Sequence, residues 1–225
     1  MGQENREQQA LSRQQVAVSP GPGPAATAGP GGEIWFVIAG SGRLESAVTG
    51  ATPIGPDTGL WLPPGAGYRL HAGGPDPLRL DTVTLPAGPA APGPAGPGAP
   101  RQDSAPLVSE LSGCPVEVTG DRQFRVLFGP GSGCEAATQF VGEIPPGRAP
   151  EHTHTYDELV LVLAGEGVLH SGGGDRPLAP GTSLHLRPGQ PHCLENTGTS
   201  TLRVLGVFHP GGSPAAKKQT GGPAR

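Results

Sequence analysis

The stretch "APEHTHTYDELVLVLAGEGVLH", residues 149–170, places ionisable side chains directly before a run of aliphatic residues. His152 and His154 are two residues apart, and Glu158 follows four residues later. Side chains two apart on a β-strand point to the same face, about 6.6 Å apart at roughly 3.3 Å rise per residue. Two imidazoles at that spacing can converge on one ion. Glu158 is an even number of residues from both histidines, so a regular strand would place it on the same face. The stretch therefore predicts a β-strand whose start carries three ionisable side chains on one face.

The aliphatic run "ELVLVLAG", residues 158–165, is apolar on both faces. A strand with one wet face would alternate apolar and polar side chains, so the outer face of this strand is expected to be covered too. Its outer aliphatics, Leu159, Leu161 and Leu163, indicate packing of one part of the chain against another, or of one chain against a second. A homodimer is therefore one expectation.

An internal repeat shows that the chain contains one pattern twice. "EIWFVIAGSGRL" at 33–44 aligns with "ELVLVLAGEGVL" at 158–169, and "GLWLPPGAGYRLHAGG" at 59–74 aligns with "SLHLRPGQPHCLENTG" at 183–198. The offsets, 125 and 124 residues, differ by one insertion. Residues 86–100 contain only Pro, Ala and Gly, which is typical of a linker. We expect two copies of one fold joined by this segment.

The 39 glycines and 29 prolines mostly stand singly between short apolar runs, where they mark tight turns. Neither copy has a helical period, so the pattern predicts an all-β sandwich or barrel. The expected organisation is a flexible N-terminus at 1–14, a first domain at 15–85, a linker at 86–105, a second domain at 106–209 and a disordered tail at 210–225.

Composition excludes several partners. The formal charge is −4 and the largest basic cluster is Lys217–Lys218, so no nucleic-acid surface is predicted. No apolar run approaches a membrane span, and the first 20 residues lack the apolar core of a signal peptide, which makes a cytoplasmic location the default. Three cysteines do not make a disulfide framework, although Cys114 and Cys134 flank an expected strand pair and a bond between them is the alternative.

The stretch around the two histidines resembles the first motif of the cupin superfamily, G-x5-H-x-H-x3–4-E-x6-G. His152, His154, Glu158 and Gly165 match it, while Gly147 leaves four residues before His152 where five are expected. The second motif, G-x5-P-x-G-x2-H-x3-N, is matched by the residues Gly181, Gly189, His192 and Asn196, with Arg187 in place of the first proline. The chain thus resembles a bicupin, which implies two cupin domains in tandem, each a double-stranded β-helix or jelly-roll barrel.

The resemblance implies a metal site formed by His152, His154, Glu158 and His192. Three imidazoles and one carboxylate suit a divalent transition metal, Fe or Mn above all and otherwise Ni, Zn, Co or Cu, whereas Ca and Mg prefer oxygen ligands. The two histidines alone would be read as solvated loop residues. Together with the glutamate and His192 at the family spacing, they predict one bound ion.

The first copy lacks most of these ligands. Glu33 corresponds to Glu158, but Thr27, Gly29 and Tyr68 stand where the three histidines are expected. One carboxylate cannot hold a transition metal, so this copy is interpreted as a degenerate cupin without metal. Its aromatic residues Trp35, Trp61 and Tyr68 are interpreted as core, with the wall of a small ligand cavity as the alternative.

Three residues near the motifs are candidates for contacts to a substrate or for proton transfer. Gln139 lies on the strand that leads to the first motif, and its side chain either faces the pocket or lies on the surface. Tyr156 would point to the same side as the ligands only if its strand is regular. His185 either supports a metal ligand or transfers protons, or it packs in the core. Its alignment with Trp61 of the first copy favours packing.

The resemblance implies metal-dependent dioxygenases, decarboxylases, oxidases, isomerases and a few hydrolases that act on small organic molecules. We expect a metal-dependent enzyme of dioxygenase, decarboxylase or isomerase type, with a small molecule as its partner and no organic cofactor. Bicupins such as the oxalate decarboxylases usually carry metal in both halves, unlike this chain. The alternative is a non-catalytic small-molecule-binding cupin, such as a sensor or binding module.

Overall fold

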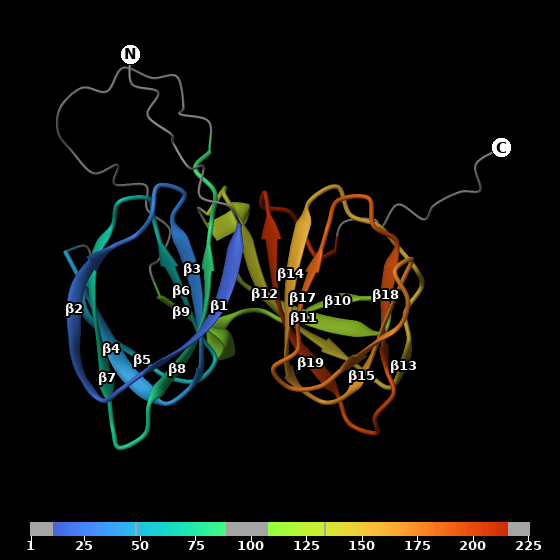
Figure 1. The fold of residues 1–225 in the computed structure, drawn as a ribbon, viewed down its shortest axis with the longest axis horizontal. Coiled ribbons are helices and arrows are strands. Elements are labelled where there is room, and N and C mark those ends of the chain that lie inside the picture. Colours follow the sequence, from blue (N-terminus) through green and yellow to red (C-terminus); the bar gives the residue numbers. More distant parts are fainter. Residues whose placement is uncertain (1–10, 48, 89–107, 133, 216–225) are drawn as a thin grey trace, which may run out of the picture. The chain divides into compact units, whose positions relative to one another are not determined.

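The computed structural model describes residues 11–47, 49–88, 108–132 and 134–215. The chain divides into two compact units, Met1–Glu110 and Leu111–Arg225. Each unit is built from two antiparallel sheets, and the described residues contain no α-helix (Figure 1). The all-β jelly-roll prediction is confirmed. No helix among the described residues is long and apolar enough to cross a membrane.

The N-terminal unit contains a five-stranded and a four-stranded sheet. The first has the strand order β1-β8-β3-β6-β9 and the second β2-β7-β4-β5. The strands are β1 (Ser12–Val18), β2 (Gly21–Thr27), β3 (Glu33–Ala39), β4 (Ser41–Ser46), β5 (Gly50–Ile54), β6 (Thr58–Leu62), β7 (Gly67–Gly73), β8 (Leu78–Thr84) and β9 (Val108–Glu110). Between the sheets lies a core of aliphatic side chains that includes Leu44, Leu60 and Leu78, all fully buried.

The C-terminal unit repeats this plan. Its sheets have the orders β10-β11-β12-β19-β14-β17 and β13-β18-β15-β16. The elements are η1 (Leu111–Gly113), β10 (Glu117–Thr119), β11 (Arg122–Phe128), η2 (Pro130–Ser132), β12 (Thr138–Ile144), β13 (Gly147–Arg148), β14 (Asp157–Ala164), β15 (Gly167–Ser171), β16 (Arg176–Leu178), β17 (Ser183–Leu186), β18 (His192–Asn196) and β19 (Leu202–His209), where η marks a 3-10 helix. Val160, Leu184 and Leu202 belong to its aliphatic core.

The repeat seen in the sequence reappears in the strand pairing. Glu33 pairs with Leu62 in the N-terminal unit, and Glu158 pairs with Leu186 in the C-terminal unit. The register shifts that bend β3 and β14 fall between Val37 and Ala39 and between Val162 and Ala164, at equivalent positions. The two units therefore share strand register and irregularities as well as general architecture.

A glycine after each of these bulges has a left-handed backbone. Gly40 and Gly165 both have φ of +82°. A Cβ atom would lie 2.6 Å from the Pro77 carbonyl oxygen at the first position and 2.7 Å from that of Thr201 at the second. Only glycine allows both the turn and the close approach of the next strand.

The expected domain limits need correction at three places. Residues 12–14 lie in β1, where they pair with β8, so they are not part of a flexible N-terminus. Val108–Glu110 pairs with β6 and thus belongs to the first unit. Gly212 is hydrogen-bonded to Thr138, so the tail after residue 209 begins as an ordered segment. Most of the expected linker, residues 89–105, lies outside the described residues. All three cysteines are free, so no bond joins Cys114 and Cys134.

Candidate metal centre

Three histidines meet at one end of the C-terminal barrel. His192 begins β18, and His152 is held beside it by a reciprocal pair of backbone hydrogen bonds, each 3.0 Å long. His154 lies two residues further along the chain. One ligand nitrogen from each of the three histidines can be chosen so that all lie within 4.8 Å of one another. The expected strand does not extend through the histidines, because β14 starts only at Asp157, so the isolated bridge between His152 and β18 brings the imidazoles together.

Glu158 adds a carboxylate to this cluster. It stands near the start of β14, and its Oε2 lies 3.1 Å from His154 Nε2 and 3.7 Å from His192 Nε2. Only 8% of the residue is exposed. Burial raises the pKa of Glu158, but the neighbouring imidazoles of His154 and His192 outweigh it and hold this pKa at about 2. The carboxylate is therefore ionised at neutral pH.

Backbone carbonyls fix the orientation of two imidazoles. His152 Nδ1 lies 3.1 Å from the carbonyl oxygen of Pro150, and His192 Nδ1 lies 2.8 Å from that of Gln190. A proton on each Nδ1 would satisfy the carbonyl and leave Nε2 as a lone-pair donor, as metal-binding histidines require. Two oriented imidazoles, a third beside them and an ionised carboxylate form a mixed nitrogen and oxygen donor set that fits a transition metal.

Beside the cluster lies a cavity of about 80 Å³. Most of its wall is apolar, formed by Phe124, Phe140, Ile144, Leu186, Leu194, Val204 and Phe208. Thr119, Arg122 and Gln123 add polar groups from the hairpin of β10 and β11. A metal-bound ligand would thus meet an apolar wall on most sides and a few polar groups on one.

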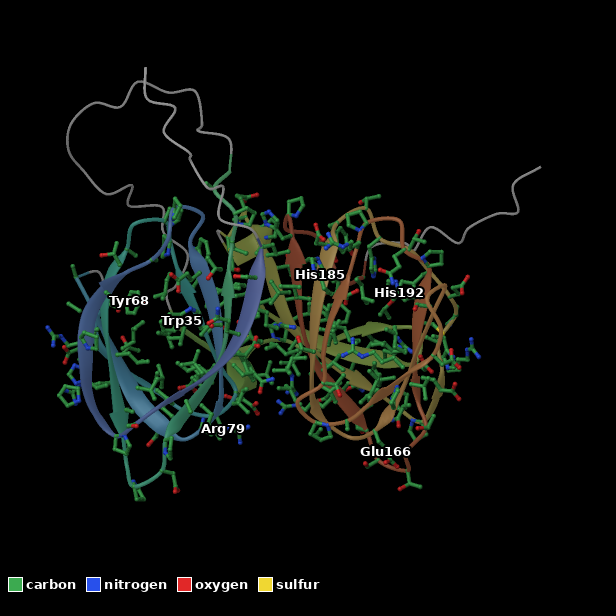
Figure 2. All side chains as sticks on the ribbon, viewed as in Figure 1. Trp35, Tyr68, Arg79, Glu166, His185 and His192 are labelled. Atoms are coloured by element: carbon green, nitrogen blue, oxygen red, sulfur yellow. The ribbon has the colours of Figure 1, made fainter. Side chains whose placement is uncertain are left out.

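The candidates for contacts to substrate occupy three different environments. Tyr156 stacks on His154, with ring centroids 4.8 Å apart and planes 16° apart, and burial raises its pKa to about 12. Gln139 is absent from the described lining of the cavity, because its neighbour Phe140 takes the inward position on β12. His185 is absent too. Its Nε2 lies 2.6 Å from Asp157 Oδ1, and it belongs to β17, whereas His192 belongs to β18 (both are labelled in Figure 2).

The equivalent place in the N-terminal unit has different chemistry. Both oxygens of Glu33 accept hydrogen bonds, one from the backbone N–H of Gly29 at 3.1 Å and one from the indole N–H of Trp35 at 3.0 Å. The Tyr68 ring packs edge-on against Trp35, with centroids 5.1 Å apart (Figure 2). An indole and a phenol thus stand where the other unit has its imidazole cluster.

A wall formed by the C-terminal segment was not foreseen from the sequence. Thr138 Oγ1 donates to the carbonyl oxygen of Gly212 at 2.6 Å and accepts from the N–H of the same residue at 3.0 Å. Two residues later, Pro214 lines the cavity. The Pro/Gly-rich composition after residue 209 concealed this role, since it is equally typical of disordered tails.

Comparison with known proteins agrees with the geometry. Residues 140–208 match the family model described as a cupin domain. An oxalate-binding protein of Thermotoga maritima is 37% identical over 68 residues, which span 29% of this chain and 56% of that protein.

Solved structures extend the likeness to both units. Oxalate decarboxylase of Bacillus subtilis at pH 4.6 matches with a TM-score of 0.68 and 14% identity over 91% of this chain and 69% of that one. A deletion mutant of the same enzyme matches with a TM-score of 0.69 and 13% identity over 90% and 69%. At such identities the likeness shows the fold alone. Residues 140–208 thus contain a cupin domain, and the two units together have the fold of a bicupin.

Proposed function

We propose that the C-terminal unit binds one divalent iron or manganese ion through His152, His154, Glu158 and His192, and that the chain is a metal-dependent enzyme acting on a small organic acid. The observation that carries this proposal is the convergence of three imidazoles and one ionised carboxylate at the wall of a small cavity. Four such ligands would leave open positions on a six-coordinate ion for a chelating substrate.

The size of the cavity and the similar proteins support an acid of few atoms. About 80 Å³ is far below the roughly 300–1,000 Å³ of sites for drug-sized ligands. The similar proteins are named for oxalate, a two-carbon acid. A bound ion would supply Lewis-acid or redox activation of the chelated acid. The chain itself would hold the ligands in place and, through Phe140, Leu186 and Phe208, keep water from the rest of the substrate.

A non-catalytic binding module is the second candidate, and one observation favours it. Among the described residues that line the cavity, Glu158 is the only carboxylate, and it is itself a proposed ligand. Tyr156 is unsuited to act as a base near neutral pH, since its pKa is about 12. A reaction that needs a separate protein base therefore lacks an evident one, whereas binding a chelating acid needs none.

The first experiment is elemental analysis of protein purified without added metal or chelator. Wild type is compared with His192→Ala and with His185→Ala, a histidine control that does not line the cavity. We expect about one ion per chain in wild type and in the control, and almost none in His192→Ala. Equal metal content in wild type and His192→Ala would refute the site.

Assays of product formation and oxygen uptake then separate the two functions. Wild type and His192→Ala are incubated with oxalate and other small acids, and turnover in wild type alone would support the enzyme. Metal-dependent binding without turnover of any acid tested would support the binding module.

The cytoplasmic location and the homodimer are further proposals. Leu159 and Leu161 are buried within the single chain, so their burial does not require a partner chain. Light scattering on the purified chain measures its mass in solution, and a mass of one chain, about 22.6 kDa, would refute the dimer.

A further inference from the structure

Arg122 brings a positive charge to the proposed metal cavity. It is the first residue of β11, and it lines the same cavity as His152, His154 and His192. Its side chain is only 14% exposed. Its Nη2 donates to the carbonyl oxygen of Leu194 at 3.2 Å, and Leu194 also lines the cavity. The guanidinium is thus tethered at the cavity wall by a neutral partner.

Its carboxylate neighbour does little to neutralise this charge. Asp121 Oδ1 lies 3.8 Å from Arg122 Nε, at the outer limit of an ion pair, and the Asp121 side chain is 76% exposed. Water screens such a contact strongly. Burial lowers the pKa of Arg122, against the opposing effect of Asp121, yet a guanidinium stays protonated throughout the physiological pH range.

The charges at the loaded site would not balance without an anion. A divalent ion carries two positive charges, Glu158 removes one, and Arg122 adds one, with the imidazoles neutral. Two positive charges would then face a largely apolar cavity, where an uncompensated charge is costly. A ligand with two carboxylates would balance them.

We propose that Arg122 is the second anion contact of the metal cavity and that it makes the site selective for small dicarboxylates over monocarboxylates. This inference rests on the proposed function and deepens it. One carboxylate occupies the open metal positions, and the carboxylate oxygens that point away from the ion accept hydrogen bonds from the guanidinium. The small volume of the site favours a short acid.

Calorimetric titration of the full-length, Mn²⁺-loaded chain tests the inference with oxalate, malonate and glycolate. Glycolate is the matched probe, because it can chelate a metal but carries one carboxylate. The variants are Arg122→Gln, Arg122→Lys and Arg176→Gln. Arg176 is exposed and absent from the described cavity lining, so its variant makes the same change in net charge away from the site.

We expect Arg122→Gln to weaken oxalate and malonate binding by about 10- to 100-fold, the usual consequence of losing hydrogen bonds to a charged group. Glycolate affinity should change by less than about threefold, and Arg176→Gln should bind all three acids as wild type does. Arg122→Lys keeps the charge but loses the planar fork, so it should lie between wild type and Arg122→Gln. Metal content, measured again after each titration, should stay at the wild-type level.

Two results would overturn the inference while leaving the metal site intact. One is unchanged oxalate affinity in Arg122→Gln at full metal occupancy, and the other is an equal loss for glycolate and oxalate. If wild type holds no Mn²⁺, the proposed function fails and the inference fails with it. If circular dichroism shows that Arg122→Gln is unfolded, the ratio of oxalate to glycolate affinity in Arg122→Lys decides, and a wild-type ratio would refute the role of Arg122.

Discussion

The substitution Thr138→Val should release the C-terminal wall of the cavity without removing a proposed metal ligand. Thr138 is 1% exposed, and its single hydroxyl makes two hydrogen bonds to the backbone of Gly212. Valine has nearly the same shape but can neither donate nor accept. The segment that ends at Pro214 would then be held by fewer contacts, including that of His209 Nδ1 with the Ala136 carbonyl oxygen at 2.9 Å.

The size of the effect follows from the two hydrogen bonds. Each neutral bond contributes about 0.5–1.5 kcal/mol net, so their loss would cost about 1–3 kcal/mol. The Gly212 backbone is only partly buried, and water can satisfy it once the segment lifts away. The lower part of the range, about 1–2 kcal/mol, is therefore expected. That change raises the fraction of open segment by about 5- to 30-fold.

Amide hydrogen exchange at Gly212 measures this opening directly. Exchange in Thr138→Val should accelerate by about 5- to 30-fold, while amides in the centre of β14 keep their wild-type rates. Ser213→Ala is the control, because it removes a single exposed hydrogen bond, from the Ala215 N–H to the serine hydroxyl, in the same segment. Wild-type exchange at Gly212 in Thr138→Val would show that the hydroxyl does not hold the segment and would refute the reasoning.

Three further predictions concern other parts of the chain. Trp35→Phe removes the indole N–H from Glu33 and should lower the stability of the N-terminal unit by about 1–3 kcal/mol in urea unfolding, with metal content unchanged. Hydrogen bonds from His170 to Glu195 and to Asp175 raise the pKa of His170 above its usual 6.5, so their stabilisation is complete below that pH and is lost as the pH rises through the raised pKa. The difference in Tm between wild type and His170→Gln should accordingly shrink as the pH rises above 6.5 through the raised pKa, and a constant difference would contradict this. Removal of the ion by a chelator should lower the Tm of wild type but not of His192→Ala, since a ligand at 100 times its Kd stabilises by about 2.7 kcal/mol.

The fold and the proposed ligands could be predicted because both show as patterns over short stretches of sequence. The spacing of His152, His154 and Glu158 marks the ligand set, although β14 starts only at Asp157 and does not contain the two histidines. The internal repeat carries over into the strand pairing, since Leu159 pairs with His185 as its counterpart Ile34 pairs with Trp61. Such features can be read from residues that are close in sequence or repeated at a fixed offset.

The rest of the cavity depends on contacts between distant segments. Whether Gln139 or its neighbour Phe140 faces inward depends on the register of β12 against β11 and β19, and β11 shifts register between Val126 and Phe128. Arg122 and Pro214 line the same cavity although they lie near opposite ends of the unit's sequence. No periodic pattern marks either residue, so only the assembled sheets reveal that they share a wall.

The two equivalent glutamates show how one fold carries two kinds of centre. Glu33 and Glu158 have the same register, yet Glu33 is satisfied by a backbone amide and an indole, whereas Glu158 faces two imidazoles. Trp35 stands at the position of Val160, and its ring with that of Tyr68 is part of a packed core. The N-terminal unit therefore differs from the C-terminal one in more than three ligands. Its carboxylate holds an indole instead of facing imidazoles, and the larger side chain of Trp35 is part of the packed core.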